Sequence, residues 1–253
     1  MSRRSARETI LPDLRSHRGP HPEDRILFDS SVWPVLQQAT DDLSWLLTRR
    51  YAIDSSIKLV GDRYQLHQRQ RLAIMRCACS EDARTRRLEV RRTASQLAGT
   101  RLLLDGYNVL ISIEAALSNG VILKARDSCY RDLASMHGTY RKVLETRPAL
   151  IMIGARLAEF QIGPCLWYLD SPVSNSGRLK TIMLELAAEH GWNWQVELVH
   201  NPDSILAESG EVIATADSMI LDRCQHWLNL ACDVIANRIS DAFVVDLGHS
   251  GTG

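Results

Sequence analysis

Short apolar runs alternate with helical segments after residue 101, and this alternation most constrains what the chain can fold into. The first run, Leu102–Leu104, is followed at once by Asp105. A buried strand of a parallel sheet has this profile, because helices cover both faces of such a sheet. Three further strands are predicted at Cys165–Asp170, Trp194–Val199 and Glu211–Thr215. The sequence therefore predicts an α/β fold with a three-layer, Rossmann-like parallel sheet.

The segments between these strands are predicted to be mostly helical. A helix should follow the first strand as far as Ala116, with a loop at Ser118–Gly120. Further helices are expected over Asp127 to about Leu144, Ala149–Phe160, Gly177–His190, a short stretch that Pro202 opens, and Ser218–Arg223. The end of the chain predicts a short edge strand and a last helix within Trp227–Ile239, and a final strand at Phe243–Asp246.

The first hundred residues have a different pattern, which predicts a small helical module. Residues 1–21 are rich in Arg, Ser, Pro and His without hydrophobic periodicity, and we expect a flexible leader there. Helices are expected at Val35–Leu47, Leu66–Cys79 and Ser80 to about Leu97, with a turn or cap at Asp54–Ser56 and another at Gly61–Asp62. The predicted division is thus a leader, a helical module over residues 22–98 and an α/β domain over residues 99–248.

Charge is unevenly distributed, although the formal net charge is zero. Residues 1–100 hold 18 Lys and Arg against 12 Asp and Glu, whereas residues 101–253 hold 12 against 18. This division is typical of a polyanion-binding module attached to a cation-binding one. The arginines of the module, with tyrosines among them, predict either a basic, stacking face for single-stranded nucleic acid or a solvated face paired with nearby acids. These residues are Arg49, Arg50, Arg63, Arg69, Arg71 and Arg76, with Tyr51 and Tyr64.

Neither a membrane span nor a secretory signal is expected. No run of about 18 apolar residues occurs, and no apolar segment follows the basic start of the chain. The six cysteines are scattered without zinc-finger spacing, which favours reduced thiols and a cytoplasmic location. Homo-oligomerisation, or a protein partner bound through the helical module, remains open.

Aspartates follow the predicted strands at their carboxyl ends. Asp105, Asp170 and Asp217 end or follow strands, and Asp203 lies in the first turn of a short helix. Ligands of open parallel sheets bind beyond the carboxyl ends of the strands. Clustered carboxylates repel one another unless a cation is present, and Mg²⁺ or Mn²⁺ prefers such hard oxygen ligands. The alternative for each aspartate is an ordinary helix cap or turn residue.

The segment LLLDGYNVL (Leu102–Leu110) resembles the opening strand of the NYN division of PIN-like ribonucleases. The resemblance implies that Asp105 binds metal and that Asn108 organises the site. VIATADSMIL (Val212–Leu221) is similar to the family strand that supplies another metal-site aspartate, here Asp217 beside Thr215. NPDSIL (Asn201–Leu206) resembles the acidic helix start before that strand, which brings in Asp203.

The chain also departs from this family. The acid that the family carries on an intervening helix has three candidates, which are Glu114, Asp127 and Asp132. The loop after the second strand is more elaborate than usual, and we expect it to contact phosphate near a helix N-terminus. Its candidate residues are Ser174, Asn175, Ser176, Arg178 and Lys180. The alternative is that this loop only caps the helix.

The helical module resembles, through Leu46–Arg71, a small domain of unknown function that precedes PIN-like domains in prokaryotic proteins.

Taken together, these features of the sequence predict a Mg²⁺- or Mn²⁺-dependent endoribonuclease. Asp105, Asp170, Asp203 and Asp217 would supply the catalytic carboxylates, and the first, second and fourth of these would bind the metal. Asn108, Thr215 and the loop of residues 174–180 would position the phosphate of the substrate or a water. Two alternatives remain: an RNA-binding protein of PIN-like fold that does not cleave, and a regulatory or interaction subunit.

Overall fold

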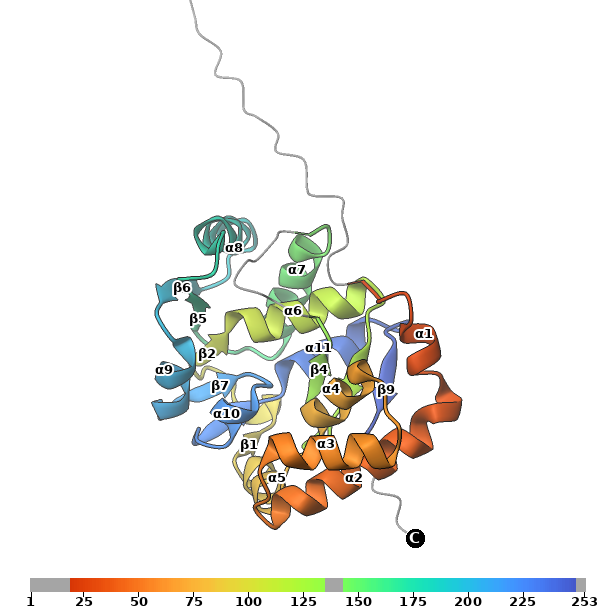
Figure 1. Cartoon of the computed structure of the whole chain (residues 1–253). Helices are drawn as coiled ribbons and strands as arrows, with labels where there is room; N and C mark the ends of the chain where they lie inside the picture. Colours follow the sequence, from red (N-terminus) through yellow and green to blue (C-terminus); the bar gives the residue numbers. More distant parts are fainter. Residues whose placement is uncertain (1–18, 135–142, 249–253) are drawn as a thin grey trace, which may run out of the picture.

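The computed structural model describes residues 19–134 and 143–248. Its centre is a six-stranded sheet in which every pairing is parallel, with the strand order β1-β8-β7-β2-β5-β6 (Figure 1). The strands are β1 (Arg91–Arg92), β2 (Leu102–Asp105), β5 (Cys165–Asp170), β6 (Trp194–Val199), β7 (Val212–Ala214) and β8 (His226–Leu228). The predicted parallel α/β sheet is confirmed, with β2 in its interior.

Helices cover both faces of this sheet, which makes three layers. Successive strand residues point to opposite faces, so Leu102 and Leu104 pack into one core and Leu103 into another. The first core also takes side chains from α6 (Gly106–Leu117), α7 (Thr146–Glu159), α8 (Ser176–His190) and α11 (Leu230–Arg238). The second core takes side chains from α9 (Pro202–Glu208) and α10 (Ser218–Leu221).

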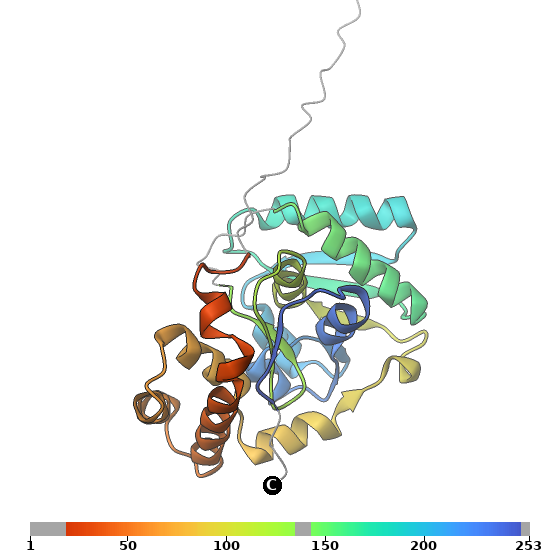
Figure 2. The same ribbon diagram turned by 90° about the vertical axis from the view of Figure 1, so that its right-hand side faces the viewer.

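The N-terminal helices pack against a second, smaller sheet. They are α1 (Asp24–Leu27), the short 3-10 helix η1 (Ser30–Val32), α2 (Trp33–Thr48), α3 (Ile53–Arg63), α4 (Gln68–Cys77) and α5 (Glu81–Glu89). The sheet has the order β4-β3-β9, with β3 (Ile122–Lys124), β4 (Tyr130–Asp132) and β9 (Val244–Asp246). Leu36, Leu43 and Ile74 share one core with Leu123 and Val245. The helical module and this sheet therefore form one packed unit, and the red to brown helices of the module lie at the left of the molecule in Figure 2.

The helix predicted from Asp127 to about Leu144 is wrong at its start. Ser128 has a positive φ of 66° in a tight turn, where Ala125 N–H donates to the Cys129 carbonyl. The chain then returns as β4, antiparallel to β3. The remainder of this prediction lies partly outside the described residues. Strand β3 was not predicted, because three residues carry too little periodicity to stand out.

Three other expectations need correction. Helix α3 begins at Ile53 without a side-chain cap, so Asp54 lies in its first turn, and the helix continues through Gly61 to Arg63. Helix α5 ends at Glu89, where the chain pairs as β1 with β8 and then forms the short 3-10 helix η2 (Ala94–Gln96). Strand β8 is consequently not at the edge of the sheet.

Several expectations are confirmed. The predicted helices at Val35–Leu47, Leu66–Cys79, Ala149–Phe160 and Gly177–His190 correspond to α2, α4, α7 and α8. The predicted final strand is β9, although it belongs to the small sheet. The predicted leader lies outside the described residues as far as residue 18. All six cysteines are free, and no helix in the described ranges is long and apolar enough to cross a membrane.

Candidate carboxylate site

Asp105 ends β2 in the middle of the sheet, between β5 and β7. Its side chain is only 7% exposed and caps α6, accepting a hydrogen bond from the Asn108 backbone N–H at 3.4 Å. Its other oxygen accepts from the Thr215 hydroxyl at 2.8 Å. The capping role is therefore real, but it uses only part of the hydrogen-bonding capacity of a carboxylate.

Gly106 is required directly after Asp105 because β5 passes close to this turn. A Cβ atom at this position would lie 2.8 Å from the Tyr168 carbonyl oxygen and 2.5 Å from a methyl carbon of Leu169. The backbone carbonyl belongs to a paired strand and has little freedom to move. The Asp-Gly pair therefore allows the first turn of α6 to begin directly against β5.

We expect the substitution Gly106→Ala to destabilise the protein by about 1–3 kcal/mol, as overpacking does. Alanine has a higher helix propensity than glycine, so a loss of stability would have to come from the clash of the added Cβ atom. The matched control is Gly177→Ala in the first turn of α8, where an added Cβ meets nothing within 4 Å. Urea unfolding of both variants checks the prediction, and equal midpoints would contradict it.

Two side chains connect the end of β2 to the loop after β7. The Thr215 hydroxyl donates to Asp105 and accepts from the Asp217 backbone N–H at 3.0 Å. The Asn108 side-chain carbonyl accepts from the Ala216 backbone N–H at 2.8 Å. Asp217 in turn caps α10 through the Met219 N–H at 2.7 Å. Asn108 and Thr215 therefore hold the loop that carries Asp217 beside Asp105.

All four predicted acids line one cleft of about 350 Å³. Asp170 comes from the end of β5 and Asp203 from the first turn of α9. The cleft lies at the carboxyl ends of the central strands, where parallel α/β sheets bind their ligands. Its lining consists of Arg76, Asp105, Tyr107, Asn108, Ile111, Asp132, Ala134, Asp170, Asn201, Pro202, Asp203 and Asp217.

The acids of the cleft influence one another electrostatically. Burial raises the pKa of Asp105 to about 7, and the charges of Asp217 and Asp203 add to this rise although the Thr215 hydrogen bond opposes it. The pKa of Asp203 is also raised, first by burial and then by the charges of Asp217 and Asp170. Protonation of Asp105 or a bound cation would relieve this repulsion.

The donor chemistry of the cleft fits a hard divalent cation. Its candidate ligands are carboxylate oxygens, but no three or more His, Cys, Asp or Glu side chains of the described residues stand close enough to form a ready metal group. Mg²⁺ commonly keeps several waters and takes only one or two carboxylates. The residues present therefore fit a partly hydrated cation in an open cleft better than a closed protein cage.

Asp132, which the sequence left as one of three candidate acids, and Arg76, which it placed on a basic face, also line the cleft. Asp132 ends β4, and its carboxylate accepts from the Ser112 hydroxyl at 2.8 Å and the Ala134 N–H at 2.9 Å. Of the three candidates for the family's helix-borne acid, it is the one that lines the cleft, and it stands on a strand. Glu114 lies buried on α6, where the Thr146 hydroxyl donates to it at 2.5 Å.

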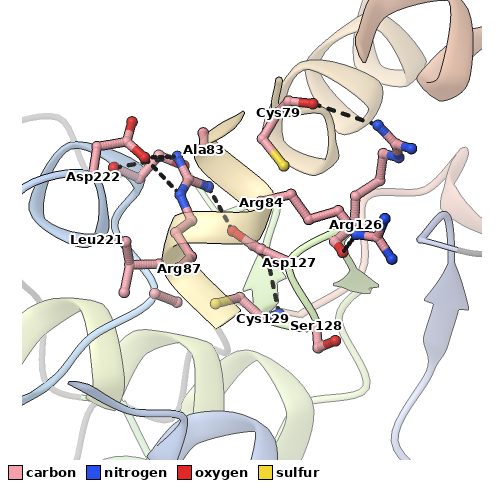
Figure 3. Close-up of polar contacts among 12 residues, drawn as sticks. Cys79, Ala83, Arg84, Arg87, Arg126, Asp127, Ser128, Cys129, Leu221 and Asp222 are labelled. Atoms are coloured by element: carbon pink, nitrogen blue, oxygen red, sulfur yellow. Dashed lines mark hydrogen bonds and ion pairs between the residues drawn. The ribbon is translucent and has the colours of Figure 1, made fainter. Parts of the chain in front are cut away.

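The third candidate, Asp127, lies in a buried ionic cluster instead. Its carboxylate accepts from Arg87 at 2.6 Å and from Arg131 at 2.6 and 2.9 Å. Arg87 also pairs with Asp222 at 2.7 Å, so its guanidinium stands between two carboxylates (Figure 3). Arg131 donates to the Ala216 carbonyl at 2.8 Å. Asp127 therefore stabilises the contact between α5 and the loop that carries Asp217.

The loop after β5 is placed differently from the four acids. None of Ser174, Asn175, Ser176, Arg178 and Lys180 belongs to the lining of the cleft. The Ser176 hydroxyl is buried, contacts the Tyr107 hydroxyl at 2.7 Å and donates to the Asp170 carbonyl at 2.8 Å. These contacts tie Ser176 to the end of β5, and no side chain of the described residues caps the N-terminus of α8 through a hydrogen bond. Phosphate contacts from this loop stay a prediction.

Most described arginines of the predicted basic face are engaged with acids. Arg69 forms two hydrogen bonds to the buried Asp24 at 2.5 and 2.9 Å, and Arg71 pairs with Asp62 at 2.8 Å. Arg63 lies 3.6 Å from Asp42. These contacts agree with the alternative of a solvated, ion-paired face, and nucleic-acid binding there stays a prediction.

Comparison with known proteins gives three findings. The family described as "Domain of unknown function (DUF5616)" matches residues 94–233, and the family described as "Protein of unknown function (DUF434)" matches residues 35–89. An uncharacterized protein of Methanocaldococcus jannaschii is 30% identical over 186 residues, which cover 74% of this chain and 88% of that protein. No solved structure matches the chain.

Proposed function

We propose that this chain, which belongs to the family described as "Domain of unknown function (DUF5616)", is a Mg²⁺- or Mn²⁺-dependent endoribonuclease with a PIN-like fold. One observation carries the proposal. Asp105, Asp170, Asp203 and Asp217 come from separate segments of the chain and line a single cleft. The parallel sheet brings the strand ends to one edge, but capping alone does not require four carboxylates to share a cleft, whereas a cation site does.

The chemistry of the cleft supports phosphodiester hydrolysis. A divalent cation bound there supplies charge to stabilise the phosphate and lowers the pKa of a bound water. Asp105, Asp170 and Asp217 would hold the cation, directly or through its waters, and Asp203 would add to the negative field. Thr215 and Asn108 would hold Asp105 and Asp217 side by side through the hydrogen bonds described above. RNA is the proposed substrate because of the resemblance to the NYN division.

Metal titration by calorimetry on the full chain, combined with cleavage of a single-stranded RNA, tests this proposal. We expect Mn²⁺ to bind at about pH 8, where Asp105 is ionised. A cation at a hundred times its dissociation constant should raise the free energy of unfolding by about 2.7 kcal/mol. Thermal unfolding with and without Mn²⁺ measures this increase.

The control is Asp62→Asn, which alters an exposed acid of α3 that is not part of the cleft. It should bind metal and cleave RNA as the wild type does. If the chain binds RNA in a salt-sensitive way but shows neither a heat of metal binding nor cleavage, it is a non-cleaving RNA-binding protein and our proposal is wrong. Absence of metal binding, RNA binding and cleavage would instead favour an interaction subunit.

A further inference from the structure

Arg76 is the one basic side chain among the described residues that line the carboxylate cleft. It comes from α4, in the N-terminal helical module, whereas the acids around it come from the α/β part of the chain. A cleft lined by five aspartates repels any polyanion that approaches it. A cation supplied by the protein at this position is therefore the feature most relevant to substrate binding.

The guanidinium of Arg76 is anchored at one end. Its Nη1 donates to the Asp132 carbonyl oxygen at 2.6 Å and lies 3.8 Å from an oxygen of the Asp132 carboxylate. The closer contact is with a neutral carbonyl, and the Asp132 carboxylate is already engaged by Ser112 and Ala134. The positive charge is therefore only partly offset by Asp132.

The rest of the guanidinium is available to the cleft. The side chain of Arg76 is 33% exposed, and the hydrogen bonds that the described residues make with it use Nη1 alone. A guanidinium carries further N–H donors in a planar fork that matches two phosphate oxygens. Arg69 and Arg71 differ, because both donate to carboxylates of the module.

Helix α4 holds Arg76 at the cleft by packing on the small sheet. Ala73, Ile74 and Cys77 of α4 are buried in the core that contains Leu123 of β3. Asp132, the anchor of Arg76, pairs with Ile122 of the same strand. The position of the guanidinium is therefore set by a rigid helix and sheet.

We propose that Arg76 binds a phosphate group of the substrate, so that the N-terminal module completes the site formed by the α/β part of the chain. This inference rests on the proposed function, because the substrate is taken to be a phosphodiester cleaved at the cleft. The module then acts as part of the active site through Arg76, and the ion-paired arginines Arg63, Arg69 and Arg71 have no part in substrate binding.

The test compares Arg76→Gln and Arg76→Lys with the wild type, using full chains, Mn²⁺ and a single-stranded RNA oligonucleotide. Loss of one charged contact should raise KM about tenfold in Arg76→Gln, and Arg76→Lys should fall between the two because it keeps the charge but not the fork. The salt dependence of binding should weaken by about 0.7 in logarithmic slope for one lost phosphate contact. The control is Arg63→Gln, at an exposed site of α3, which should leave KM unchanged.

Mn²⁺ affinity distinguishes substrate binding from a structural role. Removing a positive charge beside the carboxylates should leave Mn²⁺ binding unchanged or tighten it about two- to fivefold, while RNA binding weakens. Weaker binding of both ligands would show that Arg76 only holds β4 in place and would overturn the inference. An equal loss of RNA binding in Arg63→Gln would also overturn it.

The same experiment separates this inference from the proposed function. Wild-type cleavage together with a normal KM in Arg76→Gln would refute only the role of Arg76. Absence of both Mn²⁺ binding and cleavage in the wild type would refute the proposed function, and the inference with it.

Discussion

Replacing Asp105 with asparagine is expected to abolish metal-dependent cleavage while preserving the fold. Asp105 is one of the two buried acids of the cleft, and burial raises the pKa of its carboxyl to about 7. The asparagine amide is close in size to the carboxylate, so it should still cap α6. The negative charge that would attract the cation is lost. Because a metal ion contributes several kcal/mol to such a reaction, we expect a loss of about a thousandfold or more in kcat/KM.

Stability should change in the opposite direction to activity. The carboxyl of Asp105 titrates near 3.8 in the unfolded chain and near 7 in the folded one. Between these values the folded protein holds a proton that the unfolded chain has lost, so the free energy of unfolding falls as pH rises and levels off above about pH 7. Asparagine does not titrate, so the variant does not lose this stability as pH rises. Without metal, we expect Asp105→Asn to be more stable than the wild type at about pH 8 by roughly 1–3 kcal/mol.

Urea unfolding at about pH 5 and pH 8, with the cleavage assay, measures both effects. The difference in stability between variant and wild type should be small at the lower pH and larger at the higher one. Adding Mn²⁺ should stabilise the wild type alone. Metal-dependent cleavage that survives in Asp105→Asn would count against the whole site.

The second large effect is expected from Asp127→Asn. Asp127 is almost fully buried between Arg87 and Arg131, which are themselves buried. Removing the carboxylate charge leaves two guanidinium groups in the interior, and among the described residues Asp222 alone then pairs with one of them. Breaking a buried pair in this way costs about 3–5 kcal/mol. The loop that carries Asp217 should loosen as well, because Arg131 holds the Ala216 carbonyl.

The midpoint of urea unfolding checks this prediction. The control is Asp62→Asn, since Asp62 pairs with Arg71 at the surface and should change stability by about 0.5 kcal/mol or less. An Asp127→Asn variant as stable as this control would contradict the account of the cluster.

Acid should have the same effect as the Asp127 substitution. Burial alone would raise the pKa of Asp127, but the charges of Arg131 and Arg87 outweigh it and hold the pKa well below its usual range. The stability that the cluster contributes is therefore complete above the unfolded value near 3.8 and is lost as pH falls below it. Unfolding midpoints between about pH 5 and pH 2 should decline less steeply in the variant than in the wild type.

The main sheet and four of its acids could be predicted from sequence because their signals are local. Leu102–Asp105 and Cys165–Asp170 are apolar runs that end in an acid, and the parallel arrangement then places those acids at one edge. The expectation that Asp105, Asp170, Asp203 and Asp217 would meet at one place is confirmed by the cleft that they line. What they do there is still a proposal.

The residues that sequence reasoning missed depend on contacts between distant segments. Strand β1 has two residues and exists because it pairs with β8, more than a hundred residues later. Asp132 was placed on the helix predicted from Asp127, whereas the pairing of its segment with β3 makes that segment a strand. Arg76 was expected on a basic or solvated face with five other arginines, and the packing of α4 places it at the carboxylate cleft instead.

The sequence by itself therefore determined the layered α/β sheet and the aspartates along its edge. Both can be predicted from a few neighbouring residues, because the hydrophobic period and the end of a strand are local features of the sequence. Only the tertiary structure decided that Asp132 and Arg76 join those aspartates while Glu114 and Asp127 are buried elsewhere. The physical reason is that a side chain reaches the cleft through the packing of the element that carries it. That packing is a sum of many weak contacts between residues far apart in the chain.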